Sequence, residues 1–352
     1  SLASGGKITA QTTHGSGAGI NINALDSVVV SGDGAIATDS FGDGRGANIS
    51  INTVSLVLDS GGQVDSSALN RGAGGNINVN ADMISVSGSS DVRLSEISSK
   101  SGDIDRQAFV YDSLGYAEGT GGVINLASDT IHIFDGGRVT AEALGAGNAG
   151  AVFLGANRLE IEAGAVATSA PQSAGGNIVI QVVDFIGVVD GSITASAGGV
   201  TPTDNGGNIS IDPELMLLEN AQIVATANAG NGGNIDIVAE HIIRDRDTVI
   251  DASSKQGIDG DITIDGVVNE VNRIETIEVE YADVTKLLSQ RCTLAQLANR
   301  SSFVVLGVAD TDTPSTGVYQ QAPLTEDFVS GSLYDTSDPL LIAELSLLGC
   351  PE

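Results

Sequence analysis

Apolar and polar residues alternate in short runs along residues 5 to 265, and the runs recur in units that open with a Gly-rich turn. The first apolar residue after each turn serves as an anchor for its unit. The anchors are Ile20, Ile49, Ile77, Ile124, Val152, Ile178, Ile209, Ile235 and Ile262. They lie about 26 to 31 residues apart, except for one interval of 47. Alternation bounded by Gly, Asn, Asp and Ser predicts half-buried strands.

Each unit contains three such runs. In the unit that begins at Gly75 they are residues 76 to 79, residues 84 to 86 and a third run around Val92. The third run is clearest around Ile8, Val64, Val139, Ile193 and Ile223. Three short strands and no crossover helix predict an all-β fold, a right-handed three-sided parallel β-helix of about nine coils over residues 1–265. A propeller blade needs about 40 to 50 residues, so these units are too short for one.

The long interval predicts an insertion near residues 95–120 that projects from the rod. It carries Arg106, Phe109, Tyr111 and Tyr116. Aromatic rings and an arginine on an exposed loop suit recognition of a sugar or a protein partner. The alternative is a packed loop that caps one face of the solenoid.

An asparagine directly precedes the first strand in five units, as Asn48, Asn76, Asn177, Asn208 and Asn234. Stacked at one corner, these amides would form a ladder by hydrogen bonding to one another along the rod. Asparagine also tolerates the left-handed backbone that tight corners require. We interpret the series as structural.

After Asp265 the period stops, and residues 266–352 form a second region. Apolar residues three and four apart between Asp283 and Leu297 predict an amphipathic helix. A strand is expected at residues 302–306 and a second helix-like run at 339–348. We expect a small mixed α/β domain that caps the last coil, because the end of a solenoid must be covered.

Both cysteines of the chain, Cys292 and Cys350, lie in this second region. Two cysteines in a chain with an exported architecture favour a disulfide between them. Two unrelated buried thiols are the alternative.

The chain has a net charge of -30, from 45 acidic and 15 basic residues. Nucleic acid is therefore not expected as a partner, because phosphate binding depends on clustered Lys and Arg. The acidity is typical of a soluble surface. Turns such as Gly32-Asp33-Gly34 and Asp259-Gly260-Asp261 offer oxygen ligands, which leaves calcium as a weak alternative to the absence of any cofactor.

Catalytic residues are not evident in the sequence. The acidic residues are scattered over turns and outward strand positions, and His14, His132 and His241 fall in different coils. We therefore expect no metal site, and we expect that the protein is not an enzyme.

The coil pattern Gly-Gly-Asn-Ile-x-Ile, with its Leu-x-Leu and Gly-x-Ile-x-Ala strands, covers residues 5 to 265. Together with the tail segments Leu288-Ser-Gln-Arg-Cys292 and Ser301-Ser-Phe-Val-Val305, it resembles the filamentous haemagglutinin-like exoproteins of bacterial two-partner secretion. The resemblance implies a dedicated outer-membrane transporter as partner, a Gram-negative-type bacterium, and an extracellular or cell-surface location. It also implies that a disulfide of Cys292 with Cys350 would hold the tail at that transporter.

Three functions follow as hypotheses. The first is a structural or adhesive shaft, in adhesion or a biofilm matrix, that binds a glycan or protein of a host, a neighbouring cell or the matrix. The second is a fibre subunit that associates end to end. The third is a polysaccharide-processing enzyme, which requires three or more carboxylates converging with a basic residue. Because the chain starts partway round a coil, we expect it to be the C-terminal piece of a longer exported protein.

Overall fold

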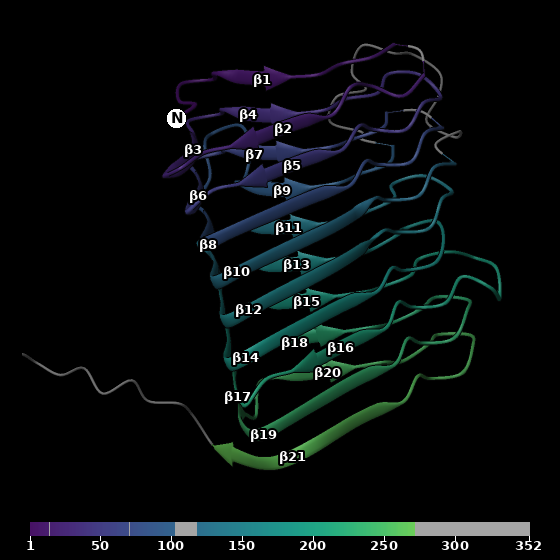
Figure 1. Cartoon of the computed structure of the whole chain (residues 1–352). Helices are drawn as coiled ribbons and strands as arrows, with labels where there is room; N and C mark the ends of the chain where they lie inside the picture. The colour runs from purple at the N-terminus through teal and green to yellow at the C-terminus, as the bar shows by residue number, and fades with distance from the viewer. Residues whose placement is uncertain (14, 70, 103–117, 272–352) are drawn as a thin grey trace, which may run out of the picture. The chain divides into compact units, whose positions relative to one another are not determined.

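The computed structural model of the protein describes residues 1–13, 15–69, 71–102 and 118–271. The chain divides into two compact units, Ser1–Glu275 and Thr276–Glu352, and the second lies outside the described residues. The described part is a parallel β-solenoid of about nine turns without a helix. Figure 1 shows the coils stacked in sequence order from β1 to β21.

One side of the solenoid is a sheet of nine short strands, one from each coil. Each has three residues, and neighbours are paired in parallel. The strands are β1 Lys7–Thr9, β4 Ala35–Ala37, β7 Gln63–Asp65, β9 Glu96–Ser98, β11 Arg138–Thr140, β13 Ala165–Ala167, β15 Ser192–Thr194, β18 Gln222–Val224 and β20 Val249–Asp251.

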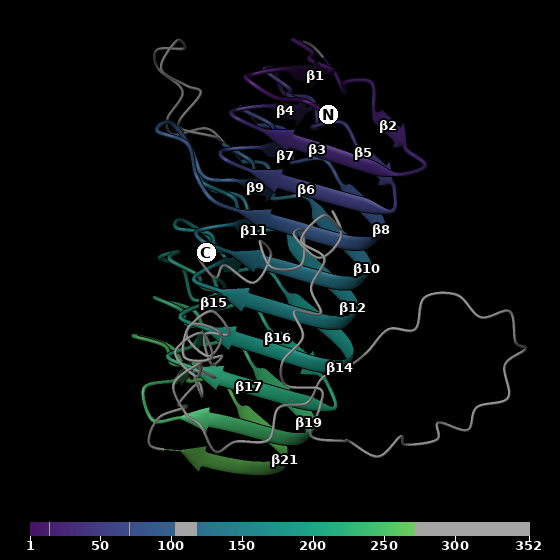
Figure 2. The ribbon, with the colours of Figure 1, turned by 90° about the vertical axis from the view of Figure 1, so that its left-hand side faces the viewer.

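The other two sides belong to a second parallel sheet, in which the first and second strands of a coil are often continuous. Figure 2 shows these long strands stacked along the solenoid. The strands are β2 Ile20–Asn23, β3 Ser27–Ser31, β5 Ile49–Asn52, β6 Ser55–Asp59, β8 Ile77–Ser87, β10 Val123–Phe134, β12 Ala151–Glu162, β14 Ile178–Val189, β16 Ile209–Asp212, β17 Leu215–Glu219, β19 Ile235–Asp245 and β21 Ile262–Val271.

Proline explains one of the interruptions in this sheet. Between β16 and β17 the chain contains Pro213, which has no N–H to donate to a neighbouring strand. The equivalent stretch of β14 has no proline and runs unbroken from Ile178 to Val189. A coil therefore has three strand segments, as predicted, but two of them commonly merge into one strand.

The anchor residues of all nine coils are register partners of one another, so they form one continuous internal ladder. Ile77, Ile178 and Ile235 are completely buried, and Ile209 is 1% exposed. The third strands supply a second ladder, in which Ile36, Val64, Ile97 and Val139 are fully buried. Because each coil covers the apolar residues of its neighbours, no coil can bury its interior alone.

The second glycine of the Gly-Gly-Asn motif has a steric role at the corner before the first strand. A Cβ built on Gly176 would overlap the backbone carbonyl of Gly150 in the preceding coil. The same clash with a neighbouring coil recurs at Gly207 and Gly233. Close backbone approach between coils therefore explains why this turn is glycine-rich.

A different corner, between the second and third strands, uses the left-handed backbone. Its residues with positive φ include Asp135 (48°), Ala163 (51°), Asp190 (50°) and Asn220 (46°). The five asparagines of the predicted ladder are not among the positive-φ residues of the described chain. Backbone conformation therefore does not explain that series.

The third strand of the coil that begins at Gly75 lies later than the sequence indicated. It is β9, which pairs with β7 and β11, whereas Val92 belongs to a loop and is 75% exposed. The predicted insertion near 95–120 therefore begins too early, because β9 and Ser101 remain in the coil and Ser101 bridges Ala68 and Ala143. Residues 103–117 lie outside the described residues.

None of the described residues forms a helix that could cross a membrane.

Candidate functional site

Several predicted site residues lie outside the part of the chain that the structure describes. These are the recognition-loop residues Arg106, Phe109, Tyr111 and Tyr116, together with Cys292 and Cys350. The recognition loop and the disulfide therefore stay predictions.

The five asparagines take part in hydrogen bonds between coils, in two separate groups, but not in the amide-to-amide ladder that was expected. The Asn208 N–H donates to the side-chain oxygen of Asn177 at 2.9 Å, and the Asn234 N–H donates to that of Asn208 at 2.8 Å. The N–H of Asn76 donates likewise to Asn48, at 3.0 Å. Each side chain thus binds the backbone of the next coil rather than another amide. These bonds tie coils together, which supports a structural role.

A second asparagine series was missed by the sequence analysis. The Asn231 N–H donates to the side-chain oxygen of Asn205 at 2.8 Å, and the Ile258 N–H donates to that of Asn231 at 3.0 Å. The sequence contains this pattern, because Asn205 and Asn231 precede Asn208 and Asn234 of the first series by the same number of residues.

Two aspartates from the turns considered for calcium have protein partners. Asp33 accepts a hydrogen bond from the Ser90 hydroxyl at 2.6 Å and lies 3.7 Å from the Arg93 guanidinium. Asp259 accepts a hydrogen bond from the Ser254 N–H at 2.8 Å. Both carboxylates therefore stabilise turns, and calcium binding there stays a prediction.

An open groove crosses the outer face of the long-stranded sheet, over β5, β8, β10, β12 and β14. Its volume is about 400 Å³. It is lined by Ser50, Asn52, Asn78, Val79, Asn80, Asn125, Leu126, Ala127, Phe153, Leu154, Gly155, Val179 and Gln181, none of which carries a charge. In a chain with a net charge of -30, this is a neutral surface.

The groove arises where small residues replace larger ones in successive coils. Asn80, Ala127, Gly155 and Gln181 occupy one outward row, so the two small residues lie between two amides. In the adjacent row Asn125 is next to Phe153, whose side chain is exposed (41%). Amide donors and acceptors thus surround a shallow floor beside an exposed aromatic ring.

The amides of this face are oriented by contacts with one another. The side-chain nitrogen of Asn125 donates to the side-chain oxygen of Asn78 at 2.8 Å. Towards the first coils, Asn52 donates in the same way to Asn23 at 3.0 Å. Each amide has two donor hydrogens and an acceptor oxygen, so these contacts leave further hydrogen-bonding capacity for a ligand.

A second site, on the outer face of the short-stranded sheet, gathers charged groups that the sequence analysis described as scattered. The Lys100 ammonium donates to both carboxylate oxygens of Glu96, at 2.9 and 2.8 Å. The Thr140 hydroxyl donates to Glu96 at 2.6 Å. Asp65 and Glu142 also act on Lys100 electrostatically. Glu96 therefore contacts Lys100 directly and two more carboxylates lie near enough to act on its charge, which corrects the expectation that the acidic residues do not cluster.

The ionisation of this cluster is perturbed in two places. Burial raises the pKa of Glu142, and the Glu96 carboxylate raises it further, while Lys100 and Arg138 act in the opposite direction. Burial alone would lower the pKa of Lys100, but the attraction of Glu96, Glu142 and Asp65 outweighs it and raises that pKa. Lys100 is thus held as a cation, and Glu142 is the carboxyl group that keeps its proton more readily than an ordinary glutamate.

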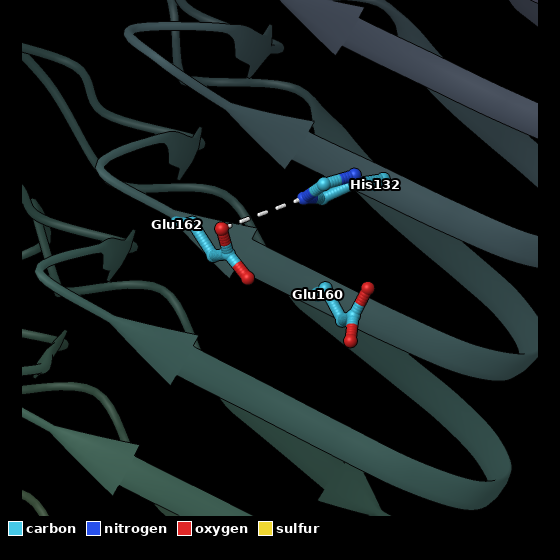
Figure 3. Close-up of side chains that lie close together, drawn as sticks. All are labelled: His132, Glu160 and Glu162. Carbon is cyan, nitrogen blue, oxygen red and sulfur yellow. Dashed lines mark ion pairs between the residues drawn. The ribbon is translucent and has the colours of Figure 1, made fainter. Parts of the chain in front are cut away.

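Elsewhere on the long-stranded sheet, His132 lies with Glu160 and Glu162, as Figure 3 shows. His132 and Glu160 are register partners in neighbouring coils. The sequence contained this signal, because both residues follow their coil anchors, Ile124 and Val152, at the same distance. It was missed because only proximity among histidines was considered.

Comparison with known proteins gives no relative for this chain: no protein-family model, curated protein or solved structure matches it.

Proposed function

We propose that this protein is a non-enzymatic extracellular shaft that binds a neutral polysaccharide along its outer face. The observation that carries the proposal is the uncharged groove beside Phe153. A sugar ring offers hydroxyls to amide side chains and an apolar face to an aromatic ring. A polyanionic glycan would be repelled by the net charge of the chain.

The architecture supports the same proposal. A β-solenoid is compatible with a structural shaft, and its coils present amides in rows about 4.8 Å apart along the column. An elongated glycan that lies along these rows would contact several coils. The resemblance of residues 5 to 265 to two-partner secretion exoproteins points to the same setting, with an outer-membrane transporter as partner and the cell surface or matrix as location.

The test is binding of the purified chain to a panel of neutral and acidic polysaccharides, followed by calorimetry with the best ligand. The Phe153→Ala variant should bind at least about tenfold more weakly, because one stacking contact is lost. Phe185→Ala is the matched control, since Phe185 is an outward aromatic residue of β14 that does not line the groove. Equal losses in both variants, or no binding of any neutral polysaccharide by the native protein, would contradict the proposal.

The second candidate function is polysaccharide processing, and the cluster of Asp65, Glu96 and Glu142 around Lys100 is the observation that favours it. Most glycoside hydrolases use a pair of carboxyl groups, one of which is protonated and acts as the general acid. Against this, the Glu96 carboxylate is already engaged by Lys100 and Thr140. An ion pair that stabilises the coils explains the same contacts.

Release of reducing ends from the polysaccharides of the panel distinguishes the two functions. The shaft proposal expects no release by the native protein. If release is found and Glu142→Gln reduces it at least a hundredfold while the fold persists, the enzyme is the correct function.

A further inference from the structure

His132, Glu160 and Glu162 bring three metal-binding groups to one point on the outer face of β10 and β12. One ligand atom from each residue lies within 4.8 Å of the other two. The Nε2 atom of His132 is 3.8 Å from a carboxylate oxygen of Glu162. Figure 3 shows the imidazole nitrogen of His132 facing Glu162 in the next coil, with Glu160 beside them.

The imidazole nitrogen that faces the carboxylates is buried and has no hydrogen-bond partner. The distance of 3.8 Å to Glu162 is too long for a hydrogen bond. The ring is held in place by stacking on Phe134, with centroids 4.1 Å apart and planes 22° apart. A buried nitrogen without a hydrogen-bond partner is therefore held in a fixed direction, facing Glu162.

Glu160 is also positioned by its neighbours. Arg158 donates to a single oxygen of Glu160, from Nε at 3.0 Å and from Nη2 at 2.6 Å. The guanidinium itself lies over the ring of Phe185, 4.3 Å from its centroid. The other oxygen of Glu160 remains available, and a ligating carboxylate is commonly oriented by a second group in this way.

We propose that His132, Glu160 and Glu162 form a binding site for a divalent transition-metal ion, with Zn²⁺ as the best fit. Imidazole nitrogen and carboxylate oxygen are zinc ligands at about 2.0 to 2.2 Å. Small side-chain rotations would bring the three atoms to that distance, since the side chain of Glu162 is 56% exposed and can turn. Calcium and magnesium prefer oxygen ligands alone, so the histidine selects against them.

The site joins two coils, because His132 belongs to β10 and both glutamates belong to β12. A bound ion would therefore act as a cross-link on the outside of the solenoid. The metal site shares no residue with the groove proposed for polysaccharide, so the two proposals can be tested independently of each other.

The test uses the full chain after treatment with chelator, titrated with ZnCl₂ by calorimetry and followed by thermal unfolding. The native protein should bind Zn²⁺ at a saturable site and unfold at a higher temperature with the ion, because a ligand that binds only the folded state stabilises it. His132→Gln should lower the number of bound ions by one and abolish the increase in unfolding temperature that this site causes. Glu162→Gln should weaken binding at least tenfold.

Two controls define the specificity of the effect. His241→Gln removes an exposed histidine from β19 and should leave the Zn²⁺ isotherm unchanged. Ca²⁺ or Mg²⁺ in large excess should not displace Zn²⁺. Identical Zn²⁺ isotherms for the native protein and His132→Gln would overturn the proposal, as would equal losses in His132→Gln and His241→Gln.

Discussion

The inner and outer faces of the same strands obey different rules. The inward anchor position is Ile in eight coils and Val in the other. The next residue along each strand faces outward, and this row contains Asn21, Ser50, Asn78, Asn125, Phe153, Val179, Ser210, Asp236 and Thr263. The interior repeat therefore specifies the fold, whereas the exterior residues vary from coil to coil and determine the local chemistry of the surface.

The largest effect is expected from a charge placed in the interior. Ile209→Asp should lower the free energy of unfolding by more than about 4 kcal/mol, because the buried carboxylate has no partner and the coils depend on one another. Chemical denaturation measures the change. The matched control Ile209→Val, which removes one methylene group, should cost about 0.5 to 1.5 kcal/mol. A stable Ile209→Asp variant would mean that the strand has the opposite face inward.

A smaller effect is expected at the corner that joins the coils. Asn208→Ala removes the acceptor for the Asn234 N–H, a hydrogen bond of 2.8 Å, and should cost about 0.5 to 1.5 kcal/mol. Asn208→Asp retains an acceptor oxygen, and the last coil already has Asp261 at this position. If the alanine and aspartate variants unfold at the same denaturant concentration, the side-chain bond between coils contributes nothing.

The smallest effect is expected from a half-buried carboxyl group on the outer face. Burial raises the pKa of Glu142, so the folded state binds its proton more tightly than the unfolded state. The native protein should therefore lose stability relative to Glu142→Gln as the pH rises from the ordinary glutamate range through the raised pKa. In acid the two should be nearly equal. Unfolding at a series of pH values measures the difference.

The matched control for that series is Glu214→Gln, which removes the same charge from an exposed position before β17. It tests whether the net charge of the chain, rather than the environment of Glu142, causes the trend. A parallel pH dependence in the two variants would contradict the assignment to Glu142.

The interior could be predicted from the sequence because it depends on local alternation and on one period. The anchors chosen by pattern are the residues that pair in the ladder, and Ile77, Ile178, Ile209 and Ile235 share it as expected. The position of β9 was mistaken because the loop around Val92 alternates as well. Local alternation does not reveal which residue pairs in register with Val64 and Val139 of the neighbouring coils. In the structure that residue is Ile97.

The outer sites could be predicted only in part, since they combine residues from neighbouring coils. Phe153 lines the groove together with Asn125, its register partner in the preceding coil, and Gly155, which has no side chain to fill the space beside the ring. An alignment of successive coils on their anchor residues would have placed His132 opposite Glu160. The groove depends on side-chain size in several coils together, and no single coil contains that information.

The separation of fold from function is tested most directly by placing the same charge on adjacent residues of β12. Val152 is fully buried and Phe153 is exposed, so Val152→Asp and Phe153→Asp place the new carboxylate on opposite faces of the same strand. Unfolding and binding of neutral polysaccharide are measured on both. We predict that Val152→Asp loses several kcal/mol of stability, whereas Phe153→Asp folds as the native protein does and loses binding. A Phe153→Asp variant that unfolds with Val152→Asp, or that folds and still binds, would contradict the account.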